Sequence, residues 1–393
     1  MKRFDVLVVG GGPAGSTTAL RLAQGGASVL LTEKAAFPRD KPCGGGLTLR
    51  AVHACPVDPT PVVEEVVDRV ELRFRFGDFV CRSAREPVIW MTQRRRLDSF
   101  LLDAAREAGV DVREETRPEL TAGSMTALVD GELYAADVVV GADGANGVTG
   151  KQFDLGNDIV HGVAYEGNAD YETVSRARYA RRAVIELADF PGGYGWVFPK
   201  AEHANVGVGA WEEEGPRIRE YLAQVCEAHG IAVSDLEHLR GHRLPFRRPA
   251  TRIASDRVLL VGDAAGLVDP ASGDGMYECF VSSRLASEAI LELLAGRSSA
   301  LDGYPDAVTA ELGALHRASW KLASALHRWP RLSWRLTRTA LAWRAIERLL
   351  SGEILRPGEA DPISQIPLRA LSYLGRRPTR RTAPPERRAR NAL

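Results

Sequence analysis

The sequence predicts an α/β domain with a parallel sheet, interleaved with an antiparallel-sheet domain and followed by a helical C-terminal region. Residues 5–33 form an apolar strand, a glycine turn, a helix and a second apolar strand, which is the pattern of a βαβ unit. Shorter segments of alternating polarity, such as 70–76, come next and are typical of antiparallel strands with one polar face. An apolar strand and glycine turn at 258–266 repeat the first pattern, so the two domains alternate along the chain.

The individual elements follow from these local patterns. The two apolar runs of the βαβ unit should pair in parallel, because such connections are right-handed crossovers. The helix between them ends at the Gly25-Gly26 pair. In chain order we predict a strand at 5–9, a helix at 16–24, a strand at 27–33, antiparallel strands within 56–90, a helix at 95–108, a strand at 136–141, antiparallel strands within 154–242, a strand at 258–261 and a helix at 275–295.

The alternation of patterns predicts two interleaved domains, each long enough to bury a core of its own. The last residues of the chain are rich in Arg and poor in apolar side chains, which is typical of disorder. We therefore predict a parallel-sheet domain from 1–55, 91–153 and 251–300, an antiparallel-sheet domain from 56–90 and 154–250, a helical region at 301–374 and a basic disordered tail at 375–393.

The composition is that of a globular protein. Of 393 residues, 45% are hydrophobic and 26% are charged, which excludes collagen-like, disordered and multi-span membrane classes. The five cysteines are an odd number without CxxC or Cys/His spacing, so we expect a reducing compartment and no metal site. The short N-terminus runs directly into the first strand and leaves no room for a signal peptide, which predicts a cytoplasmic protein.

The C-terminal region is basic and carries four tryptophans. Residues 301–393 hold 17 Arg and Lys against 8 Asp and Glu, a net charge of +9, which leaves −9 on residues 1–300. Two interpretations stay open: a helical subdomain that packs on the body, or peripheral docking on the inner face of an anionic membrane. Pro330 and the interspersed arginines exclude a spanning helix. The tryptophans are Trp320, Trp329, Trp334 and Trp343.

Residues 10–15 form a nucleotide-binding motif. Gly10, Gly12 and Gly15 follow a strand and open a helix, and Glu33 ends the next strand, 21 residues after Gly12. The first glycine permits the tight turn, the second lets the backbone approach a pyrophosphate and the third lets helix and strand pack closely. The helix N-terminus offers unpaired N–H groups to the phosphates, and an acidic Glu33 can accept hydrogen bonds from ribose hydroxyls. Together these features predict a Rossmann-like dinucleotide-binding domain.

Four segments, in the expected order, resemble the flavoprotein superfamily that includes the aromatic hydroxylases. They are the turn at 10–15, Thr92-QRRRLDSFLLDAA with Arg94 at the Arg-x-x-Leu-Asp position, Gly141-ADGANG and Leu259-LVGDAAGLVDPASGDGMYECF. The resemblance implies that FAD is the cofactor and that Asp263 meets its ribityl and pyrophosphate region. It also implies that the helix beginning near Gly275-Met276 points N–H groups at the pyrimidine end of the isoalloxazine ring, which favours negative charge there.

Two further motifs resemble the geranylgeranyl reductase family, which shares this fold. Residues 38–45 read Pro-Arg-Asp-Lys-Pro-Cys-Gly-Gly and match its Pro-x-x-Lys-Pro-Cys-Gly-Gly motif. Residues 194–200 match its Tyr-x-Trp-x-Phe-Pro-Lys motif. The resemblance covers residues 3 to about 300 and departs at 272–276, where Ser-Gly-Asp-Gly-Met replaces Ser-Gly-Glu-Gly-Ile. It implies reduction of isolated C=C bonds in a polyprenyl chain carried on a lipid, quinone, diphosphate or chlorophyll precursor.

The residue chemistry is compatible with such a substrate. Cys43 lies beside Lys41 and three glycines, and a nearby cation favours thiolate while small neighbours admit flavin or substrate. Alternating aromatic residues at 194–198 share one strand face, and Gly207 and Gly209 could leave room for an extended chain. The catalytic candidates are Cys43, Tyr194, Trp196 and Lys41. The cofactor-binding candidates are Gly10, Gly12, Pro13, Ala14, Gly15, Glu33, Lys34, Cys43, Gly44, Arg94, Asp263, Gly275 and Met276.

Other functions stay open on the sequence alone. Halogenases of the same fold carry the motif Trp-x-Trp-x-Ile-Pro. Residues 194–199 are close to this motif but lack its first Trp. A flavin-dependent monooxygenase or halogenase is therefore one alternative. A non-enzymatic prenyl-binding escort is another, although Cys43 and the Asp263 segment argue against it. No second Gly-x-Gly-x-x-Gly unit indicates a separate nicotinamide site, so NADPH, NADH and ferredoxin all remain candidate electron donors. An electron-carrier protein is thus a candidate partner, and we expect no nucleic-acid partner.

Overall fold

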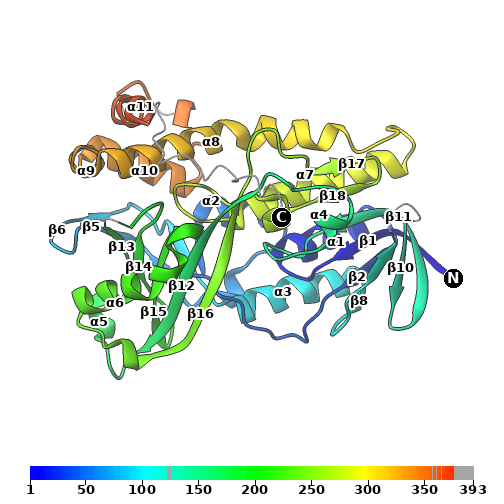
Figure 1. Ribbon diagram of the computed structural model, residues 1–393, viewed down its shortest axis with the longest axis horizontal. Coiled ribbons are helices and arrows are strands. Elements are labelled where there is room, and N and C mark those ends of the chain that lie inside the picture. Colours follow the sequence, from blue (N-terminus) through cyan, green and yellow to red (C-terminus); the bar gives the residue numbers. More distant parts are fainter. Residues whose placement is uncertain (122–124, 189, 356, 360, 364, 376–393) are drawn as a thin grey trace, which may run out of the picture.

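The computed structural model describes residues 1–375 apart from 122–124, 189, 356, 360 and 364. Its strands form sheets of eight, seven and three strands. Figure 1 shows the eight-stranded sheet at one end of the molecule, the seven-stranded sheet at the other, and the C-terminal helices along one side of both. Both predicted kinds of sheet are therefore present. Of the predicted tail at 375–393, all residues after Gly375 lie outside the described part of the chain.

The eight-stranded sheet is built around the first strand. β1 (Lys2–Val9) pairs in parallel with β2 (Val29–Thr32) and with β11 (Glu132–Gly141). The carboxyl ends of these strands therefore meet at one edge of the sheet, as the βαβ pattern predicts. The parallel pairing continues to β8 (Asp111–Arg113) and β18 (Val258–Leu260), while β9 (Glu119–Thr121), β10 (Thr126–Val129) and β17 (Ala254–Ser255) join the sheet in antiparallel pairs.

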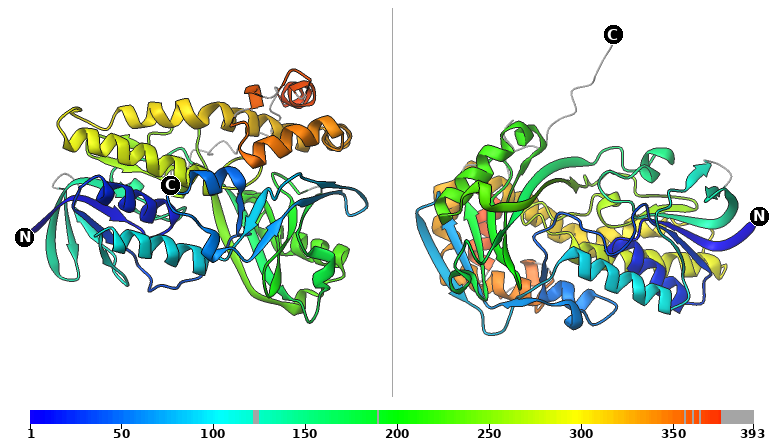
Figure 2. Two further views of the ribbon diagram at one scale, coloured as in Figure 1. Left: turned by 180° about the vertical axis from the view of Figure 1, so that it is seen from behind. Right: turned by 90° about the horizontal axis from the view of Figure 1, so that it is seen from below.

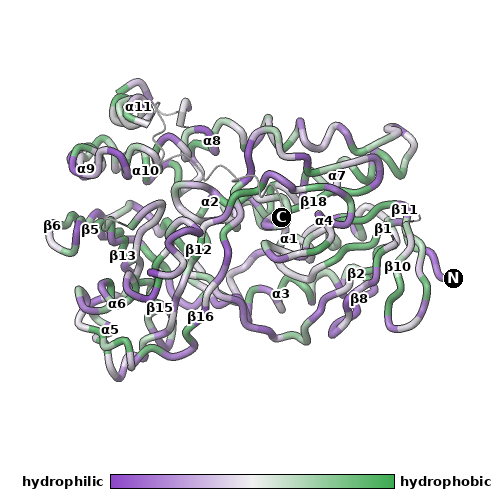
Figure 3. Tube along the Cα trace, viewed as in Figure 1, coloured by the Kyte–Doolittle hydropathy of each residue, from purple (hydrophilic) through white to green (hydrophobic). Residues whose placement is uncertain are grey.

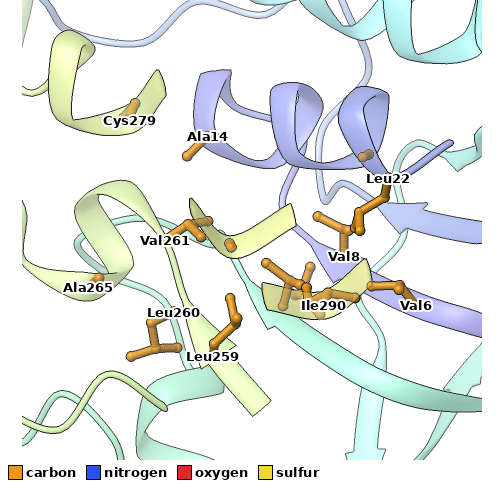
Figure 4. Close-up of a cluster of buried hydrophobic side chains, with 14 of the residues drawn as sticks. Val6, Val8, Ala14, Leu22, Leu259, Leu260, Val261, Ala265, Cys279 and Ile290 are labelled. Atoms are coloured by element: carbon orange, nitrogen blue, oxygen red, sulfur yellow. The ribbon is translucent and has the colours of Figure 1, made fainter. Parts of the chain in front are cut away.

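Three helices pack on or beside this sheet. Helix α1 (Pro13–Gln24) packs against both α3 (Arg94–Glu107) and α7 (Met276–Leu294). Figure 4 shows side chains of α1 and α7 directed toward apolar residues of β1 and β18. Small residues let the helices approach closely, since the Ser283 hydroxyl of α7 donates to the Ala14 carbonyl oxygen of α1 at 2.8 Å. The predicted helices agree with these bounds to within three residues.

The seven-stranded sheet has the order β16-β12-β15-β14-β13-β5-β6. Helix α6 (Ile218–His229) and its apolar neighbours fill one face. Most neighbours are antiparallel, as predicted, but β5 and β13 run parallel. These two strands come from chain segments that are separated by part of the other sheet, so no hairpin links them. The strands are β5 (Arg69–Phe74), β6 (Asp78–Ser83), β12 (Val160–Asp170), β13 (Arg182–Leu187), β14 (Gly195–Pro199), β15 (His203–Trp211) and β16 (Leu236–Phe246).

The three-stranded sheet anchors the segment that carries Cys43. β7 (Ile89–Met91) pairs with β3 (Gly46–Thr48) and with β4 (Glu65–Val67), in both cases antiparallel. β3 begins directly after Gly45, and α2 (Leu49–Ala54) follows it. The Cys43 segment is therefore tied at its C-terminal end to regular structure. β4 lies within the residues predicted for the antiparallel domain, yet it pairs in this small sheet.

The C-terminal region is helical, as predicted. Figures 1 and 2 show α8 running beside α7 and on toward the seven-stranded sheet, where α9 and α10 lie. Within the described residues, no helix has the length and hydropathy needed to cross a membrane. Figure 3 shows hydrophilic residues interrupting these helices. They are α8 (Gly303–Arg328), α9 (Pro330–Thr337), α10 (Ala340–Ser351) and α11 (Gln365–Leu374).

Three of the four C-terminal tryptophans pack against the body. Trp320 stacks on Trp211 with ring centroids 5.8 Å apart, and Trp334 stacks on Phe74 at 5.6 Å. Trp343 is buried, whereas Trp329 is 45% exposed. Packing on the body thus accounts for three of these four tryptophans, and of the four only Trp329 is placed to contact a surface outside the molecule.

Candidate functional site

The turn between β1 and α1 is closed around two glycines. Gly10 has φ +110°, and a Cβ there would lie 2.4 Å from the carbonyl oxygen of Ala142. A Cβ on Gly15 would lie 1.8 Å from the carbonyl oxygen of Gly10. Neither position has room for a side chain. The two glycines therefore let the first turn of α1 lie against the ends of β1 and β11.

Gly12 opens helix α1 and faces two arginines. It is the N-cap residue, and Pro13 occupies the first helical position with Ala14 buried behind it. A Cβ on Gly12 would lie 3.5 Å from Arg39 Nη2 and 3.9 Å from Arg94 Nη2. The N–H groups of the first helical turn and two guanidinium groups thus border the same space. Such an arrangement suits an anionic pyrophosphate.

A buried carboxylate holds both arginines in place. Asp98 on α3 accepts hydrogen bonds from Arg94 Nε at 2.6 Å and from Arg94 Nη2 at 2.7 Å, and Arg39 Nη1 lies 3.1 Å from its Oδ2. Burial lowers the pKa of Arg94, but the ion pair with Asp98 outweighs burial and keeps that pKa above its ordinary value. Arg39 Nη2 also lies 3.7 Å from Oε2 of Glu33, so the two guanidinium groups face two carboxylates at this turn.

Glu33 is buried at the end of β2 and fixes the same turn. Its Oε2 accepts the Gly11 N–H at 2.9 Å and its Oε1 accepts the Ala35 N–H at 3.1 Å. Each oxygen retains acceptor capacity, so the carboxylate can still receive ribose hydroxyls. The neighbouring Lys34 is exposed, and its side chain has no described contact with this turn.

Asp263 joins two motifs that are far apart in sequence. Its Oδ2 accepts a hydrogen bond from Lys41 Nζ at 3.1 Å and lies 3.6 Å from His242 Nε2. Burial would raise the pKa of Asp263, but Lys41 and His242 outweigh it and hold that pKa well below its usual range. A Cβ on Gly275 would lie 3.4 Å from Asp263 Oδ1, so the carboxylate also borders the start of α7.

The first turn of α7 carries its own acidic cap. Asp274 Oδ1 accepts the Met276 N–H at 2.9 Å, while Asp274 Oδ2 is buried without a hydrogen-bond partner. Burial, reinforced by Glu278, raises the pKa of Asp274 to about 7. The Tyr194 hydroxyl donates to the carbonyl oxygen of Ser272 in the same loop. The chain itself therefore satisfies one N–H group at the start of α7. The sequence pattern does not indicate this hydrogen bond.

The segment at Cys43 is held by two oppositely charged side chains of the seven-stranded sheet. Glu166 on β12 accepts the Cys43 N–H at 2.7 Å through Oε1. Lys200, directly after β14, donates from Nζ to the carbonyl oxygens of Gly44 at 2.6 Å and of Thr92 at 2.9 Å. Burial raises the pKa of Glu166 to about 7 and lowers the pKa of Lys200 to about 8. The backbone around Cys43 is thus held against the seven-stranded sheet.

The aromatic residues of the second motif form a continuous row. Tyr194 and Trp196 have ring centroids 6.1 Å apart, and Trp196 and Phe198 6.2 Å. The predicted room beside Gly207 is wrong, because a Cβ there would lie 2.1 Å from Trp196 Cζ2, and the indole ring fills the space. At Gly209 the nearest atom to such a Cβ is 3.9 Å away, so that position is open.

A small polar cleft of about 30 Å³ opens beside the Cys43 segment. Its lining includes Cys43, Glu166, Lys200, Arg94 and the amides of β12 and β15. The amides are fixed in a chain, in which Trp196 Nε1 donates to Asn205 Oδ1 at 2.8 Å and Asn205 Nδ2 donates to Asn168 Oδ1 at 3.1 Å. Within the described residues, no cluster of His, Cys, Asp and Glu is arranged to hold a metal ion.

Comparison with known proteins defines the family. A model of the FAD-binding domain family matches residues 3–307. The geranylgeranyl diphosphate reductase of a Synechocystis species is 32% identical over 317 residues, which cover 73% of this chain and 75% of the relative. The chain belongs to the geranylgeranyl reductase family. Digeranylgeranylglycerophospholipid reductase 1 of Methanopyrus kandleri, 31% identical over 315 residues, covers 74% of this chain and 81% of its own length.

Solved structures agree with the family at the level of the fold. A geranylgeranyl bacteriochlorophyll reductase-like protein from Thermoplasma acidophilum has a TM-score of 0.78 at 23% identity, over 95% of this chain and 97% of that one. A flavin-dependent brominase has a TM-score of 0.74 at 18% identity, over 95% and 99%. The geranylgeranyl reductase fold is thus shared with halogenating enzymes, and these likenesses alone do not distinguish the two chemistries.

The residues of this member of the geranylgeranyl reductase family fit FAD. Two glycines exclude side chains from the turn, two arginines border it, and a carboxylate stands at each end, the buried Glu33 and the partly buried Asp263. The structure brings most predicted site residues into this region, and Lys34 is the exception. Glu166, Arg39, Asp98 and Asp274 were not predicted. Arg39 and Asp98 lie within quoted motifs and could have been found there, whereas nothing local marks Glu166.

We expect Glu33→Ala and Asp263→Ala to weaken FAD retention. Each change removes acceptors in a buried part of the site, at a cost of about 1 to 3 kcal/mol, or roughly 5- to 150-fold in Kd. Flavin fluorescence titration of the apoprotein measures the effect. Glu132→Ala removes an exposed carboxylate of β11 and serves as the control. Full flavin and unchanged Kd in both site variants would contradict the assignment.

Proposed function

We propose that this protein is an FAD-dependent reductase that saturates isolated C=C bonds of a polyprenyl chain. The observation that supports it best is the position of the Cys43 segment. Lys41 of that segment contacts Asp263, and Gly44 packs against the aromatic row, since a Cβ there would lie 2.9 Å from Phe198 Cδ2. The cofactor motif and the family's aromatic motif thus meet on the two sides of one short loop. The relatives named above act on geranylgeranyl compounds by their names, and this loop carries the Lys-Pro-Cys-Gly-Gly motif that resembles the family.

The chemistry divides between the cofactor and the chain. Bound, reduced FAD supplies a hydride, and the chain must bind the prenyl segment, exclude water and deliver a proton to the second alkene carbon. An apolar aromatic row beside a polar cleft is suited to binding the prenyl segment, excluding water and delivering the proton. We assign Cys43 as the group that donates the proton or positions the alkene, with Tyr194 second. Trp196 forms the wall, and Lys41 fixes the loop through Asp263.

The proposal is tested by anaerobic incubation of the dithionite-reduced protein with a panel of geranylgeranyl lipids, quinones, diphosphates and chlorophyll precursors. Mass spectrometry should show product masses that rise in steps of two hydrogens. Oxygen-dependent hydroxylation, or chlorination with halide, would instead support the monooxygenase or halogenase alternative. A purified protein that retains no FAD and only binds prenyl groups would support the escort alternative. NADPH, NADH and reduced ferredoxin are then compared as donors by the rate of flavin bleaching.

We also propose that the protein is cytoplasmic and touches the inner face of the membrane through α9 and its flanks. Trp329, Leu332 and Leu341 are exposed there, and Arg331 and Arg335 are exposed beside them. Exposed apolar side chains flanked by arginines suit an anionic bilayer surface.

The double variant Trp329→Ala/Leu332→Ala should reduce binding to vesicles that contain phosphatidylglycerol about tenfold, or ~1.4 kcal/mol, because the two side chains bury only part of their apolar surface at a bilayer interface. Co-sedimentation measures the effect. Leu133→Ala removes an exposed leucine of β11 and serves as the control. Equal binding of the wild type and the double variant would exclude this surface.

A further inference from the structure

Glu166 lies in the middle of β12, opposite Gly207 of β15 and Arg240 of β16. Gly207 in turn lies opposite Trp196 of β14. Side chains at directly paired positions point to the same face of a sheet, so Glu166 and the Trp196 indole share the face that bears the Cys43 segment. The absence of a side chain at Gly207 lets the indole extend across this row toward Glu166.

The carboxyl group of Glu166 has one oxygen committed and one available. Oε1 accepts the Cys43 N–H at 2.7 Å. Among the described residues, no hydrogen bond reaches Oε2, and the side chain lines the cleft while only 8% of the residue is exposed. A carboxyl group beside the Cys43 loop, with a free oxygen and little water, is positioned to exchange a proton with a molecule in the cleft.

The competing acids are less suited to this transfer. The Tyr194 hydroxyl donates to Ser272, and burial raises the pKa of Tyr194, which makes it a weaker acid. Lys200 uses Nζ to hold the carbonyl oxygens of Gly44 and Thr92. Cys43 Sγ accepts the Gly45 N–H at 3.3 Å, which fixes the sulfur in place without consuming its proton.

We propose that Glu166 is the acid that protonates the alkene in the reduction, and that Cys43 positions the alkene. The inference rests on the proposed function. In the balanced step, one alkene carbon receives a hydride, whose two electrons come from the reduced cofactor, and the other receives the proton of the neutral Glu166 carboxyl. The C=C π bond, the bond that holds the hydride in the reduced cofactor and the Glu166 O–H bond break, two C–H bonds form, the cofactor is oxidised by two electrons, and Glu166 is left as a carboxylate that water reprotonates after product release.

Burial keeps a substantial neutral fraction of the Glu166 carboxyl near pH 7. Burial raises the pKa of Glu166 to about 7 against the opposing effect of its hydrogen bond to Cys43, and Lys200 and Arg240 lower it while Asp40 raises it. A donor with a pKa near the working pH combines a sufficient protonated fraction with sufficient acidity. The other ionisable groups that line the cleft are Lys41, Cys43, Arg94, His203 and His238.

Glu166→Gln tests the inference, because the amide keeps an oxygen for the Cys43 N–H and loses the acidic proton. The wild-type rate of anaerobic oxidation of the reduced protein by a prenyl substrate should fall about tenfold per pH unit above pH 7, because ionised Glu166 cannot donate. In Glu166→Gln the rate should be about 100-fold lower at pH 6.5, and that pH dependence should disappear. The infrared carbonyl absorption of neutral carboxyl groups that titrates near pH 7 should decrease in the variant, and the part that remains belongs to Asp274, whose pKa is also about 7.

The matched control is Glu186→Gln. Glu186 is another buried carboxylate of the same sheet, accepts the Phe76 N–H at 2.8 Å, and does not line the cleft. Its replacement should keep the rate and the pH dependence. A Glu166→Gln variant with the wild-type rate and pH profile would overturn the inference while leaving the proposed function intact. A wild-type protein that reduces no member of the prenyl panel would refute the proposed function itself.

Discussion

Replacing Cys43 with alanine should slow the anaerobic oxidation of the reduced protein by a prenyl substrate about 100-fold or more, or ~2.7 kcal/mol in activation free energy. The sulfur has a fixed place in the cleft, because the Gly45 N–H donates to it and Glu166 and Lys200 hold the adjoining backbone. Its removal leaves a gap beside the reacting carbons, and a misplacement of about 1 Å can cost 100-fold in rate. FAD content and its reduction by the electron donor should stay at the wild-type level.

Stopped-flow flavin absorbance under anaerobic conditions follows both the reduction of FAD by the electron donor and its oxidation by the prenyl substrate. Cys43→Ser keeps a small polar group and should fall between the wild type and the alanine variant. The decrease in rate above pH 7 should persist in Cys43→Ala if Glu166 donates the proton. Alkene reduction by Cys43→Ala at the wild-type rate would show that the thiol only packs and does not position the alkene.

Much of the fold could be predicted because its signals are local. The apolar runs of β1 and β11, the glycine turn after β1 and the apolar face of α3 each lie within a dozen residues, and all three are confirmed. The parallel pair of β5 and β13 could not be predicted from such signals. Paired residues of the two strands, such as Phe74 and Leu187, are 113 positions apart in the sequence, and no turn residue specifies which way the strands run.

The same distinction applies to the site. The glycine turn and the two family motifs are contiguous in sequence, so their residues could be named in advance. Glu166 could not be named in advance. It is one of several charged residues along β12, and the alternating pattern does not indicate which loop its side chain contacts. Gly207 was misjudged for a related reason: a glycine in a strand signals that something lies close, and only the structure shows that the indole of Trp196 fills the space.

Gly45→Ala should lower prenyl reduction by two orders of magnitude or more, through displacement of the Cys43 segment. Gly45 has φ +68°, and a Cβ there would lie 2.1 Å from the Thr92 carbonyl oxygen and 2.3 Å from Lys200 Nζ. The left-handed conformation alone costs an alanine about 1–2 kcal/mol. The overlap with the backbone of Thr92 and with the ammonium group adds about 1–3 kcal/mol unless the loop moves.

Gly131→Ala separates these two contributions. Gly131, in the turn between β10 and β11, has φ +79°, and a Cβ there would meet no atom within 4 Å. Both variants should therefore lose about 1–2 kcal/mol of unfolding free energy from backbone strain, measured by urea denaturation. Only Gly45→Ala should also lose prenyl reduction, because only there does the methyl group displace Lys200 from the carbonyl oxygens that fix Cys43. Wild-type activity in Gly45→Ala, with the lowered stability of both variants, would show that the position of this loop does not control the reaction.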